Sequence, residues 1–229
     1  KDYNIEIFDS VNPNPTLESV EKITNKFKKS NFSSIIALGG GSVIDTAKAL
    51  AVSLNKKADI SMKKIFREKK DIKIKHALPI TAVPTTSGTG SEVTHFATIW
   101  DSEYKKKYSL ESNYIKPKAV ILDPQLTIDL SEEMTLFPAL DSISHSLESI
   151  WNINSDDSSR TFATESLKLS VSILPKILKS PNDIEGRLLM QLSSLLAGLA
   201  ISKTKTAIAH SISYPLTSHF EIPHGLAAS

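Results

Sequence analysis

The sequence predicts an α/β half over residues 1–131 followed by an all-helical half over residues 132–229. Two observations support this division. Strand-like apolar runs alternate with helical ones in the first half, which is typical of a parallel sheet covered by helices. After Asp123-Pro124-Gln125-Leu126 the strand pattern stops, and helical periodicity continues to the last residue. We therefore expect a parallel sheet first and a helical domain second.

The expected elements of the first half follow from hydrophobic periodicity and from loop-forming residues. They are a strand at residues 3–8, a loop at 12–15, a helix at 17–27, a strand at 34–38, a helix at 43–54 and a strand at 77–83. Residues 56–75 carry nine Lys or Arg against three acidic residues. We interpret this basic segment as a solvated linker and helix face.

Prolines divide the helical half. Because proline lacks a backbone N–H and its ring clashes with the preceding turn, it usually ends or kinks a helix. We expect breaks at Pro138, Pro175, Pro181, Pro215 and Pro223. The acidic residues before Pro138 also fit a helix that starts at this proline.

The composition favours a protein that handles small molecules. The formal charge is +2, from 27 basic and 25 acidic residues, so no chain-wide field attracts nucleic acid or an anionic membrane surface. The absence of cysteine excludes thiolate metal sites and leaves histidine and carboxylate as the strong metal ligands. No apolar run reaches the roughly 20 residues that span a bilayer, and residues 1–7 lack a signal-peptide pattern. We expect a cytoplasmic protein without membrane or nucleic-acid partners.

Two loops of small residues follow predicted strands. Gly39-Gly40-Gly41-Ser42 leads from a strand directly into a helix, so backbone N–H groups and the helix N-terminus can approach a phosphate without Cβ interference. The second loop, residues 84–91, is dense in hydroxyls that can bond phosphate and ribose oxygens. Ligands of open parallel sheets bind at the carboxyl ends of the strands, so the two loops together indicate a nucleotide site.

Four residues form a candidate metal site. Asp141 and His145 are four residues apart in a helical pattern, which puts a carboxylate and an imidazole on one face. His210 stands in an apolar helical stretch, where an unpaired imidazole would be costly, and His224 lies in a loop fixed by proline and glycine. Three imidazoles and one carboxylate suit Fe²⁺, Zn²⁺, Mn²⁺ or Ni²⁺, with room for one substrate oxygen. Ligand roles are not expected for the remaining histidines, which are His76, His95 and His219.

Six motifs, taken in order, resemble the iron-containing, or group III, alcohol dehydrogenases. They are Asn12-Pro-Asn-Pro-Thr16, Gly39-Gly-Gly-Ser-x-x-Asp45-x-x-Lys48, Pro84-Thr-Thr-Ser-Gly-Thr-Gly-Ser-Glu92, Asp123-Pro124, Asp141-x-x-x-His145 and Pro223-His224-Gly225. The resemblance implies a dehydroquinate synthase-like architecture, in which a dinucleotide-binding α/β domain and a helical domain enclose the active site. It also implies NAD or NADP, a divalent metal that is Fe²⁺ or alternatively Zn²⁺, and a homodimer.

The resemblance assigns the family's functional positions to residues of this chain. The metal ligands, which form the catalytic centre, would be Asp141, His145, His210 and His224. The dinucleotide contacts would be Asn14, Gly40, Gly41, Ser42, Asp45, Thr85, Thr86, Thr89, Ser91, Lys107 and Leu126. The chain looks incomplete for the family, with the first strand missing at the front and several helices missing at the back.

Two departures from the family pattern bear on mechanism and substrate. Tyr214 stands where most members have a second histidine, so proton delivery near the nicotinamide is expected to differ. Lys203 and Lys205 precede the His210 helix and add two cations, which favour an anionic substrate. This segment, with residues 94–100 and 106–110, looks similar to the branch that reduces phosphonoacetaldehyde to 2-hydroxyethylphosphonate.

The expected function is therefore metal-dependent hydride transfer between a nicotinamide cofactor and a small aldehyde, with phosphonoacetaldehyde as the leading substrate. One alternative is an alcohol, glycerol or glycerol-phosphate dehydrogenase that acts on another small substrate. A second is a dehydroquinate synthase-like lyase, which net turnover of NADH would separate from a dehydrogenase. A third is a non-catalytic protein that keeps the fold for assembly, which four intact ligand positions argue against.

Overall fold

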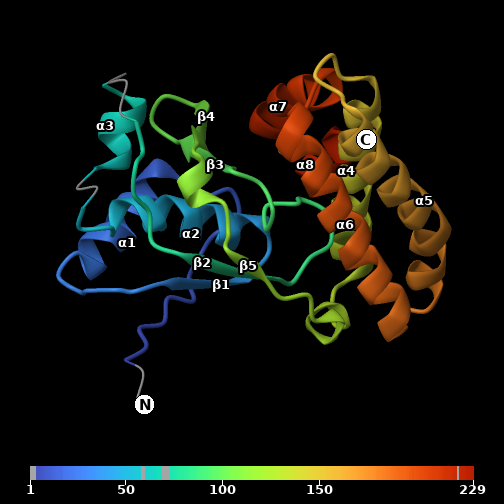
Figure 1. Cartoon of the computed structure of the whole chain (residues 1–229), viewed down its shortest axis with the longest axis horizontal. Helices are drawn as coiled ribbons and strands as arrows, with labels where there is room; N and C mark the ends of the chain where they lie inside the picture. The colour runs from blue at the N-terminus through green and yellow to red at the C-terminus, as the bar shows by residue number, and fades with distance from the viewer. Residues whose placement is uncertain (1–3, 58–59, 69–72, 221) are drawn as a thin grey trace.

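The computed structural model describes residues 4–57, 60–68, 73–220 and 222–229. Figure 1 shows a half built of strands and short helices beside a half built of long helices. The chain passes from the first to the second after η2 (Pro124–Thr127), where α4 (Glu132–Trp151) begins. This order of an α/β part and an all-helical part confirms the predicted fold class.

The α/β half contains a parallel sheet and an antiparallel pair. Its other elements, in chain order, are α1 (Leu17–Phe27), β1 (Ile35–Gly39), α2 (Gly41–Ser53), α3 (Met62–Phe66), β2 (Ile80–Pro84), β3 (Phe96–Asp101), β4 (Lys106–Glu111), η1 (Asn113–Ile115) and β5 (Ala119–Val120). β1, β2 and β5 form the predicted parallel sheet in the order β1-β2-β5. Gly39 at the end of β1 lies beside Pro84 at the end of β2, so the loops after both strands leave the same edge of the sheet.

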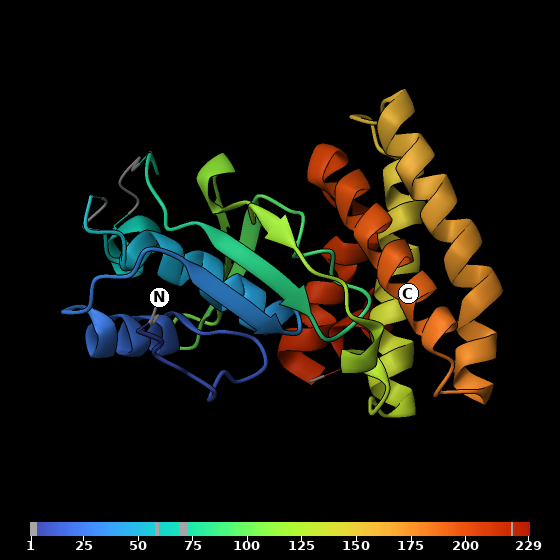
Figure 2. The ribbon, with the colours of Figure 1, turned by 60° about the horizontal axis from the view of Figure 1, so that its bottom comes forward.

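α2 is the central helix of this half. It packs between the parallel sheet and the β3–β4 pair, as the two views in Figures 1 and 2 show. α1 contributes Leu17 and Val20 to the same core, where both are fully buried. Burying such side chains contributes roughly 1.5–3 kcal/mol each. On the opposite face of the sheet, Ile36 and Leu38 are exposed to 72% and 57%.

The helical half consists of α4, α5 (Asp157–Lys179), α6 (Ile184–Thr204), α7 (Ile208–Phe220) and α8 (His224–Ala227). α4, α5 and α6 pack side by side as a bundle (Figure 2). Each starts with a polar cap, because the side chains of Ser131, Asp156 and Asp183 accept a backbone N–H of the first turn. Buried serines on facing helices hydrogen-bond inside the bundle, as Ser146 does with Ser166 at 2.9 Å.

Glycines bring the loop of residues 84–91 against the helical half. A Cβ atom at Gly88 would lie 2.1 Å from the carbonyl oxygen of Pro138 on α4. Gly90 has φ +61°, and a Cβ there would lie 2.4 Å from Cα of Gly198 on α6. Any larger residue would push the loop away from these helices. The loop predicted to bind phosphates is therefore held between the two halves.

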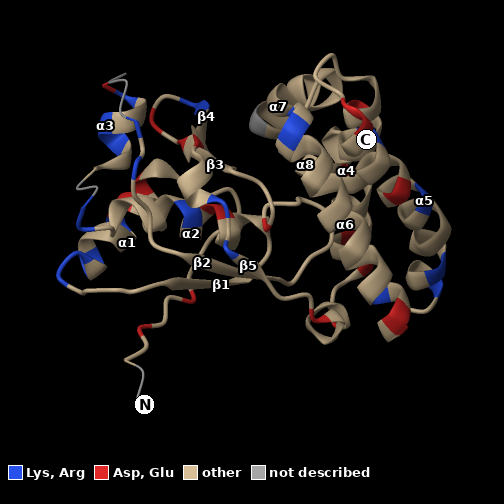
Figure 3. Cartoon of the chain, in the orientation of Figure 1, with Lys and Arg blue, Asp and Glu red and all other residues tan. Residues whose placement is uncertain are grey.

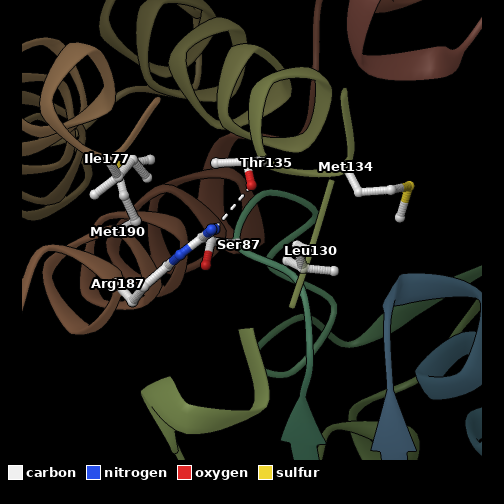
Figure 4. A pocket seen from close by; sticks show the side chains of 7 residues that line it. All are labelled: Ser87, Leu130, Met134, Thr135, Ile177, Arg187 and Met190. Atoms are coloured by element: carbon white, nitrogen blue, oxygen red, sulfur yellow. Dashed lines mark hydrogen bonds between the residues drawn. The ribbon is translucent and has the colours of Figure 1, made fainter. Parts of the chain in front are cut away.

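Two buried side chains of α6 make polar contacts with neighbouring elements, and one of them, Gln191, joins the two halves. Gln191 Nε2 donates to the carbonyl oxygens of Pro84 and Asp123, at 3.4 and 3.2 Å. Arg187 donates to Oγ1 of Thr135 on α4 at 2.8 Å (Figure 4). The cavity beside it, of about 10 Å³, is lined by Ser87, Leu130, Met134, Thr135, Ile177, Arg187 and Met190. Its volume suits about one water molecule, so it is too small to receive a substrate.

The strands differ from the prediction in two places. The strand predicted at residues 3–8 is wrong for its described part, since residues 4–8 form no strand and Tyr3 lies outside the described residues. Ile5 and Ile7 alternate as in a strand but are exposed to 73% and 77%, so no packing against a sheet favours pairing. The antiparallel β3–β4 pair, in contrast, was not predicted.

Three of the five predicted proline breaks are wrong. α4, α5 and α7 continue through Pro138, Pro175 and Pro215, whereas Pro181 and Pro223 lie between helices. The predicted helix start at Pro138 is also wrong, because α4 begins six residues earlier behind its Ser131 cap. An interior proline costs about 3 kcal/mol. Packing of the flanking turns in the bundle core, with Ala139 and Leu174 in one buried cluster, offsets that cost.

One described helix, α6, is long and apolar enough to cross a membrane by length and composition alone. It has 21 residues, and 56% of its most apolar window is buried inside the structure. α6 contacts both α4 and α5. It is therefore one of three helices that pack against one another in the bundle.

The basic segment surrounds α3, where Figure 3 shows Lys and Arg gathered. The lysines of α3 are exposed, as predicted for a solvated face. Arg67 differs, because its guanidinium pairs with Glu18 at 2.8 Å, Asp101 at 2.8 Å and Glu103 at 2.6 Å. This residue links α1 and the β3–β4 turn to the end of α3.

Candidate metal and dinucleotide site

The four residues predicted as metal ligands converge in the helical half. Asp141 and His145 lie one turn apart on α4, His210 lies on α7 and His224 begins α8. Oδ1 of Asp141 lies 3.2 Å from Nε2 of His210, 3.6 Å from Nε2 of His145 and 3.9 Å from Nε2 of His224. The first three residues are buried, and His224 is half-buried. One carboxylate oxygen therefore faces three imidazole nitrogens.

Close packing of α8 on α4 places His224. A Cβ atom at Gly225 would lie 2.0 Å from the carbonyl oxygen of Phe137, so glycine is needed for this approach. The hydroxyl of Ser144 donates to the carbonyl oxygen of Ala228 at 2.7 Å and fixes the end of α8. Gly225 therefore allows α8 to pack closely against α4, which places His224 beside Asp141.

The electrostatics of the cluster prepare it for a cation. Burial by itself would raise the pKa of Asp141, but the neighbouring histidines hold it well below its usual range. Burial lowers the pKa of His145 to about 4 and also lowers that of His224, so both rings are neutral near pH 7. The pKa of His210 is raised despite burial, because Asp141 and Glu148 are both hydrogen-bonded to it. The ionised Asp141 and the neutral rings of His145 and His224 are in the state that binds metal, and His210 would release a proton when a cation binds.

The donor atoms fit a divalent cation. A tetrahedral site with ligand distances of about 2.0–2.1 Å separates its donors by roughly 3.4 Å. The separations from Oδ1 of Asp141, between 3.2 and 3.9 Å, bracket that value. Donor atoms of Asp141, His210 and His224 all lie within 4.8 Å of one another, and His145 adjoins this group through its Nε2.

A second buried carboxylate, Glu148, belongs to the site and was not predicted. It lies on α4 three residues after His145 and seven after Asp141, on the same helical face. Its Oε2 atom is 2.7 Å from Nδ1 of His210. The spacing D-x-x-x-H-x-x-E is the signal in the sequence that could have identified it.

The two predicted phosphate loops lie side by side at the carboxyl ends of β1 and β2. A Cβ atom at Gly40 would be 3.3 Å from Oγ1 of Thr86, and one at Gly41 would be 2.7 Å from Cγ2 of Thr89. The backbone N–H of Thr85 donates to the carbonyl oxygen of Gly39 at 3.1 Å. Ser42 is also in contact with Asn14, whose backbone N–H donates to its hydroxyl at 3.1 Å. The structure thus brings together Asn14, Gly40, Gly41, Ser42, Thr85, Thr86 and Thr89.

Asp45 and Ser91, also predicted as cofactor contacts, are hydrogen-bonded to each other. The hydroxyl of Ser91 donates to Asp45 at 2.6 Å, and the other oxygen of Asp45 accepts the backbone N–H of Thr98 at 2.8 Å. Fully buried Lys48 donates to Ser91 at 2.9 Å and to Thr94 at 3.0 Å. This network fixes α2 to the second loop and to β3, and Asp45 and Ser91 use their polar atoms within it.

Glu92 lies beside this network and makes the fold sensitive to pH. It is 3% exposed, and burial raises its pKa to about 7. A folded-state pKa above the unfolded value stabilises the fold below about pH 4.5, and this contribution is lost as the pH rises through 7. The free energy of unfolding of wild type should fall as the pH rises from 4.5 to 7.5, whereas that of Glu92→Gln should not. The difference between them should therefore shift in favour of the variant by on the order of 3 kcal/mol over this range. Denaturant unfolding at both pH values measures this, and an equal difference at both would contradict it.

Lys107 reaches from β4 towards the four predicted metal ligands. Its ammonium lies 3.4 Å from the ring centroid of Tyr214 on α7. Burial lowers the pKa of Lys107 to about 8, and the carboxylates of Asp45 and Asp141 oppose this shift. Tyr214 in turn stacks on His224 with centroids 6.2 Å apart. Lys107 therefore lies where the dinucleotide loops and the metal ligands meet.

The other predicted contacts lie further from this centre. Leu126 is on η2, near the sheet edge, and is 39% exposed. Lys203 is paired with Asp156 at 3.0 Å, and Lys205 is paired with Glu111 at 2.9 Å. Both lysines are exposed and lie against these surface carboxylates. The structure therefore pairs the two predicted substrate lysines with surface carboxylates and not with the group of predicted metal ligands.

Comparison with known protein families gives two matches that cover most of the chain. Residues 1–124 match the iron-containing alcohol dehydrogenase family, and residues 135–229 match the C-terminal domain of the same family. Among relatives, an NAD-dependent methanol dehydrogenase of Bacillus methanolicus is 30% identical over 99% of this chain and 58% of its own length. A phosphonoacetaldehyde reductase of Streptomyces viridochromogenes is 32% identical over 93% of this chain and 54% of its own length.

The solved structures give the same result. A sulfoacetaldehyde reductase from Bifidobacterium kashiwanohense, in complex with NAD+, superposes with a TM-score of 0.90 at 33% identity and covers 96% of this chain and 58% of its own. The chain thus spans less than two thirds of the length of these relatives. The matches cover both halves of the fold, and the chain belongs to the iron-containing alcohol dehydrogenase family.

Proposed function

We propose that this chain carries the metal and dinucleotide sites of an NAD(P)-linked dehydrogenase that interconverts a small aldehyde and its alcohol. One observation carries this proposal. Nε2 atoms of His145, His210 and His224, which come from three helices, all lie within 3.9 Å of Oδ1 of Asp141. The family membership and the relatives support Fe²⁺ as the metal and NAD as the cofactor, with Zn²⁺ and NADP as alternatives. The resemblance also supports a cytoplasmic homodimer.

The roles of the residues follow from their positions. A divalent cation bound there would supply a Lewis acid for the aldehyde oxygen, and the nicotinamide would supply the hydride. Backbone N–H groups at Gly41 and Ser42, at the start of α2, would bind the pyrophosphate. Thr86 and Thr89 would add hydroxyl donors from the neighbouring loop. Tyr214 would cover His224 against water, and burial raises the pKa of its hydroxyl, so Oη keeps its proton at neutral pH.

An anionic aldehyde, phosphonoacetaldehyde in particular, is the proposed substrate. Relatives of this chain include a phosphonoacetaldehyde reductase and a sulfoacetaldehyde reductase, whose named substrates carry an anionic group on a two-carbon aldehyde. Lys203 and Lys205 are engaged in surface ion pairs. Lys107, half-buried beside Tyr214 and under the influence of Asp141, is the ammonium better placed to pair with such a substrate.

A neutral alcohol is the second candidate. The relatives also include methanol and 1-propanol dehydrogenases at 30% and 31% identity. The ion pairs of Lys203 and Lys205 favour this candidate, because both predicted substrate lysines are already paired with carboxylates.

The two candidates differ in a steady-state assay. We expect the Fe²⁺-loaded protein to oxidise NADH with phosphonoacetaldehyde at a kcat/KM at least tenfold above that for propanal. A paired charge in a partly desolvated cleft contributes at least about 1.4 kcal/mol, which corresponds to this factor. Equal values would favour the neutral alcohol. No net oxidation of NADH with either compound would contradict the dehydrogenase itself and favour the lyase chemistry found on the related architecture.

A further inference from the structure

The side chain of Glu148 is fully buried where α4 meets α7. Its Oε2 atom accepts the backbone N–H of Ala207 at 2.9 Å, and its Oε1 atom accepts the backbone N–H of His210 at 3.2 Å. Oε2 also lies 2.7 Å from Nδ1 of His210. Three hydrogen bonds thus join one carboxylate to a single short stretch, residues 207–210.

The hydrogen bond between Nδ1 of His210 and Glu148 determines the tautomer of the His210 ring. An ionised carboxylate can only accept hydrogen bonds, so Nδ1 must carry a proton. In the neutral ring the lone pair is then on Nε2, which lies 3.2 Å from Oδ1 of Asp141. A ligating histidine needs its lone pair on the nitrogen that faces the metal. A carboxylate behind the ring orients it and raises the basicity of that nitrogen.

The two backbone bonds fix the helix that carries this ring. The first N–H groups of a helix have no partner within the helix, and α7 begins at Ile208. Glu148 accepts N–H groups from Ala207 and His210, at the start of that helix. Since Glu148 is on α4 with Asp141, one side chain sets the position of α7 relative to the carboxylate ligand.

We propose that Glu148 is a positioning residue for metal binding, which holds His210 with Nε2 towards the cation and fixes the start of α7 against α4. This inference rests on the metal-dependent function proposed above. A purely structural role, as a buried cap for α7, would affect stability alone. Metal affinity separates the two roles.

Titration of the metal-free protein with Co²⁺, followed by its visible absorption, tests the proposal. We expect Glu148→Gln to weaken Co²⁺ binding 10- to 100-fold, the usual effect of losing such a partner. Glu133→Gln, an exposed glutamate in the first turn of the same helix, is the matched control and should bind as wild type does. Wild-type affinity in Glu148→Gln, even with lowered thermal stability, would overturn the proposal. Absence of Co²⁺ binding by wild type would overturn the metal-dependent function together with it.

A second measurement needs no variant at Glu148. The ¹⁵N shifts of histidine rings in metal-free wild-type protein report which nitrogen carries the proton, and His210→Gln identifies the resonances of His210. We expect a protonated Nδ1 and an unprotonated Nε2 in the neutral ring. The opposite tautomer would overturn the proposal, whether or not Glu148→Gln folds.

Discussion

The His210→Ala variant is expected to lose metal binding and turnover, while its affinity for NAD stays within about twofold of wild type. His210 supplies the Nε2 atom nearest to Oδ1 of Asp141, at 3.2 Å. Removing it takes away one of the four proposed ligands and leaves the charge of buried Glu148 facing a cavity. Loss of one partner of such a buried pair costs about 3–5 kcal/mol of folding stability. Loss of an outer-shell partner already weakens metal binding about 10- to 100-fold, so loss of a ligand itself should weaken it by at least about 100-fold. Metal content after dialysis and NADH binding by fluorescence measure the two effects separately.

The control for this experiment is His219→Ala. His219 lies on the same helix but is exposed, so its removal should change neither metal content nor turnover. Full activity of His210→Ala in metal-free buffer would show that the reaction does not use this cluster. Equal losses in both variants would point instead to general damage to α7.

The Gly41→Val variant should show the opposite behaviour, with NAD binding weakened at least tenfold and metal binding unchanged. The first side-chain atom at this position would already lie 2.7 Å from Cγ2 and 2.8 Å from Oγ1 of Thr89. The two loops would have to separate, and the valine would block the approach of a phosphate to the first N–H groups of α2. A tenfold loss corresponds to about 1.4 kcal/mol. Isothermal titration with NAD measures it.

Gly186→Ala is the matched control for crowding. Its Cβ would lie 2.7 Å from Cγ2 of Ile177, inside the helical half and away from the loops. We expect it to lower the free energy of unfolding without changing the affinity for NAD. If Gly41→Val bound NAD as wild type does, the loop of residues 39–42 would not be the pyrophosphate site.

The sequence predicted those parts of the molecule that depend on local pattern. The spacing of Asp141 and His145 was sufficient to place them on one helical face, and the glycine runs were sufficient to locate two loops at strand ends. The division into an α/β and a helical half followed from periodicity. In each case the residues that determine the feature are neighbours along the chain.

Features that depend on distant partners could not be predicted in this way. Glu148 has the right spacing on α4, but its function depends on N–H groups of residues 207–210, which only the folded chain brings near. Lys203 appeared free to bind an anion, whereas Asp156, 47 residues earlier in sequence, occupies it. The prolines inside α4, α5 and α7 are tolerated because the bundle stabilises the helices on both sides.

The distance between the ligands along the chain has a consequence for how the molecule holds together. Asp141 and His210 are 69 residues apart, with α5 and α6 between them. A cation bound to both is a cross-link across that span, and closing a loop of this size restricts the unfolded chain by about 4 kcal/mol. α4, α5 and α6 can assemble through contacts between consecutive helices. α7 and α8 contact α4 through Glu148 and Ser144, and a bound ion would fasten them further. Supply of such a cation would then influence how long the folded chain resists proteases.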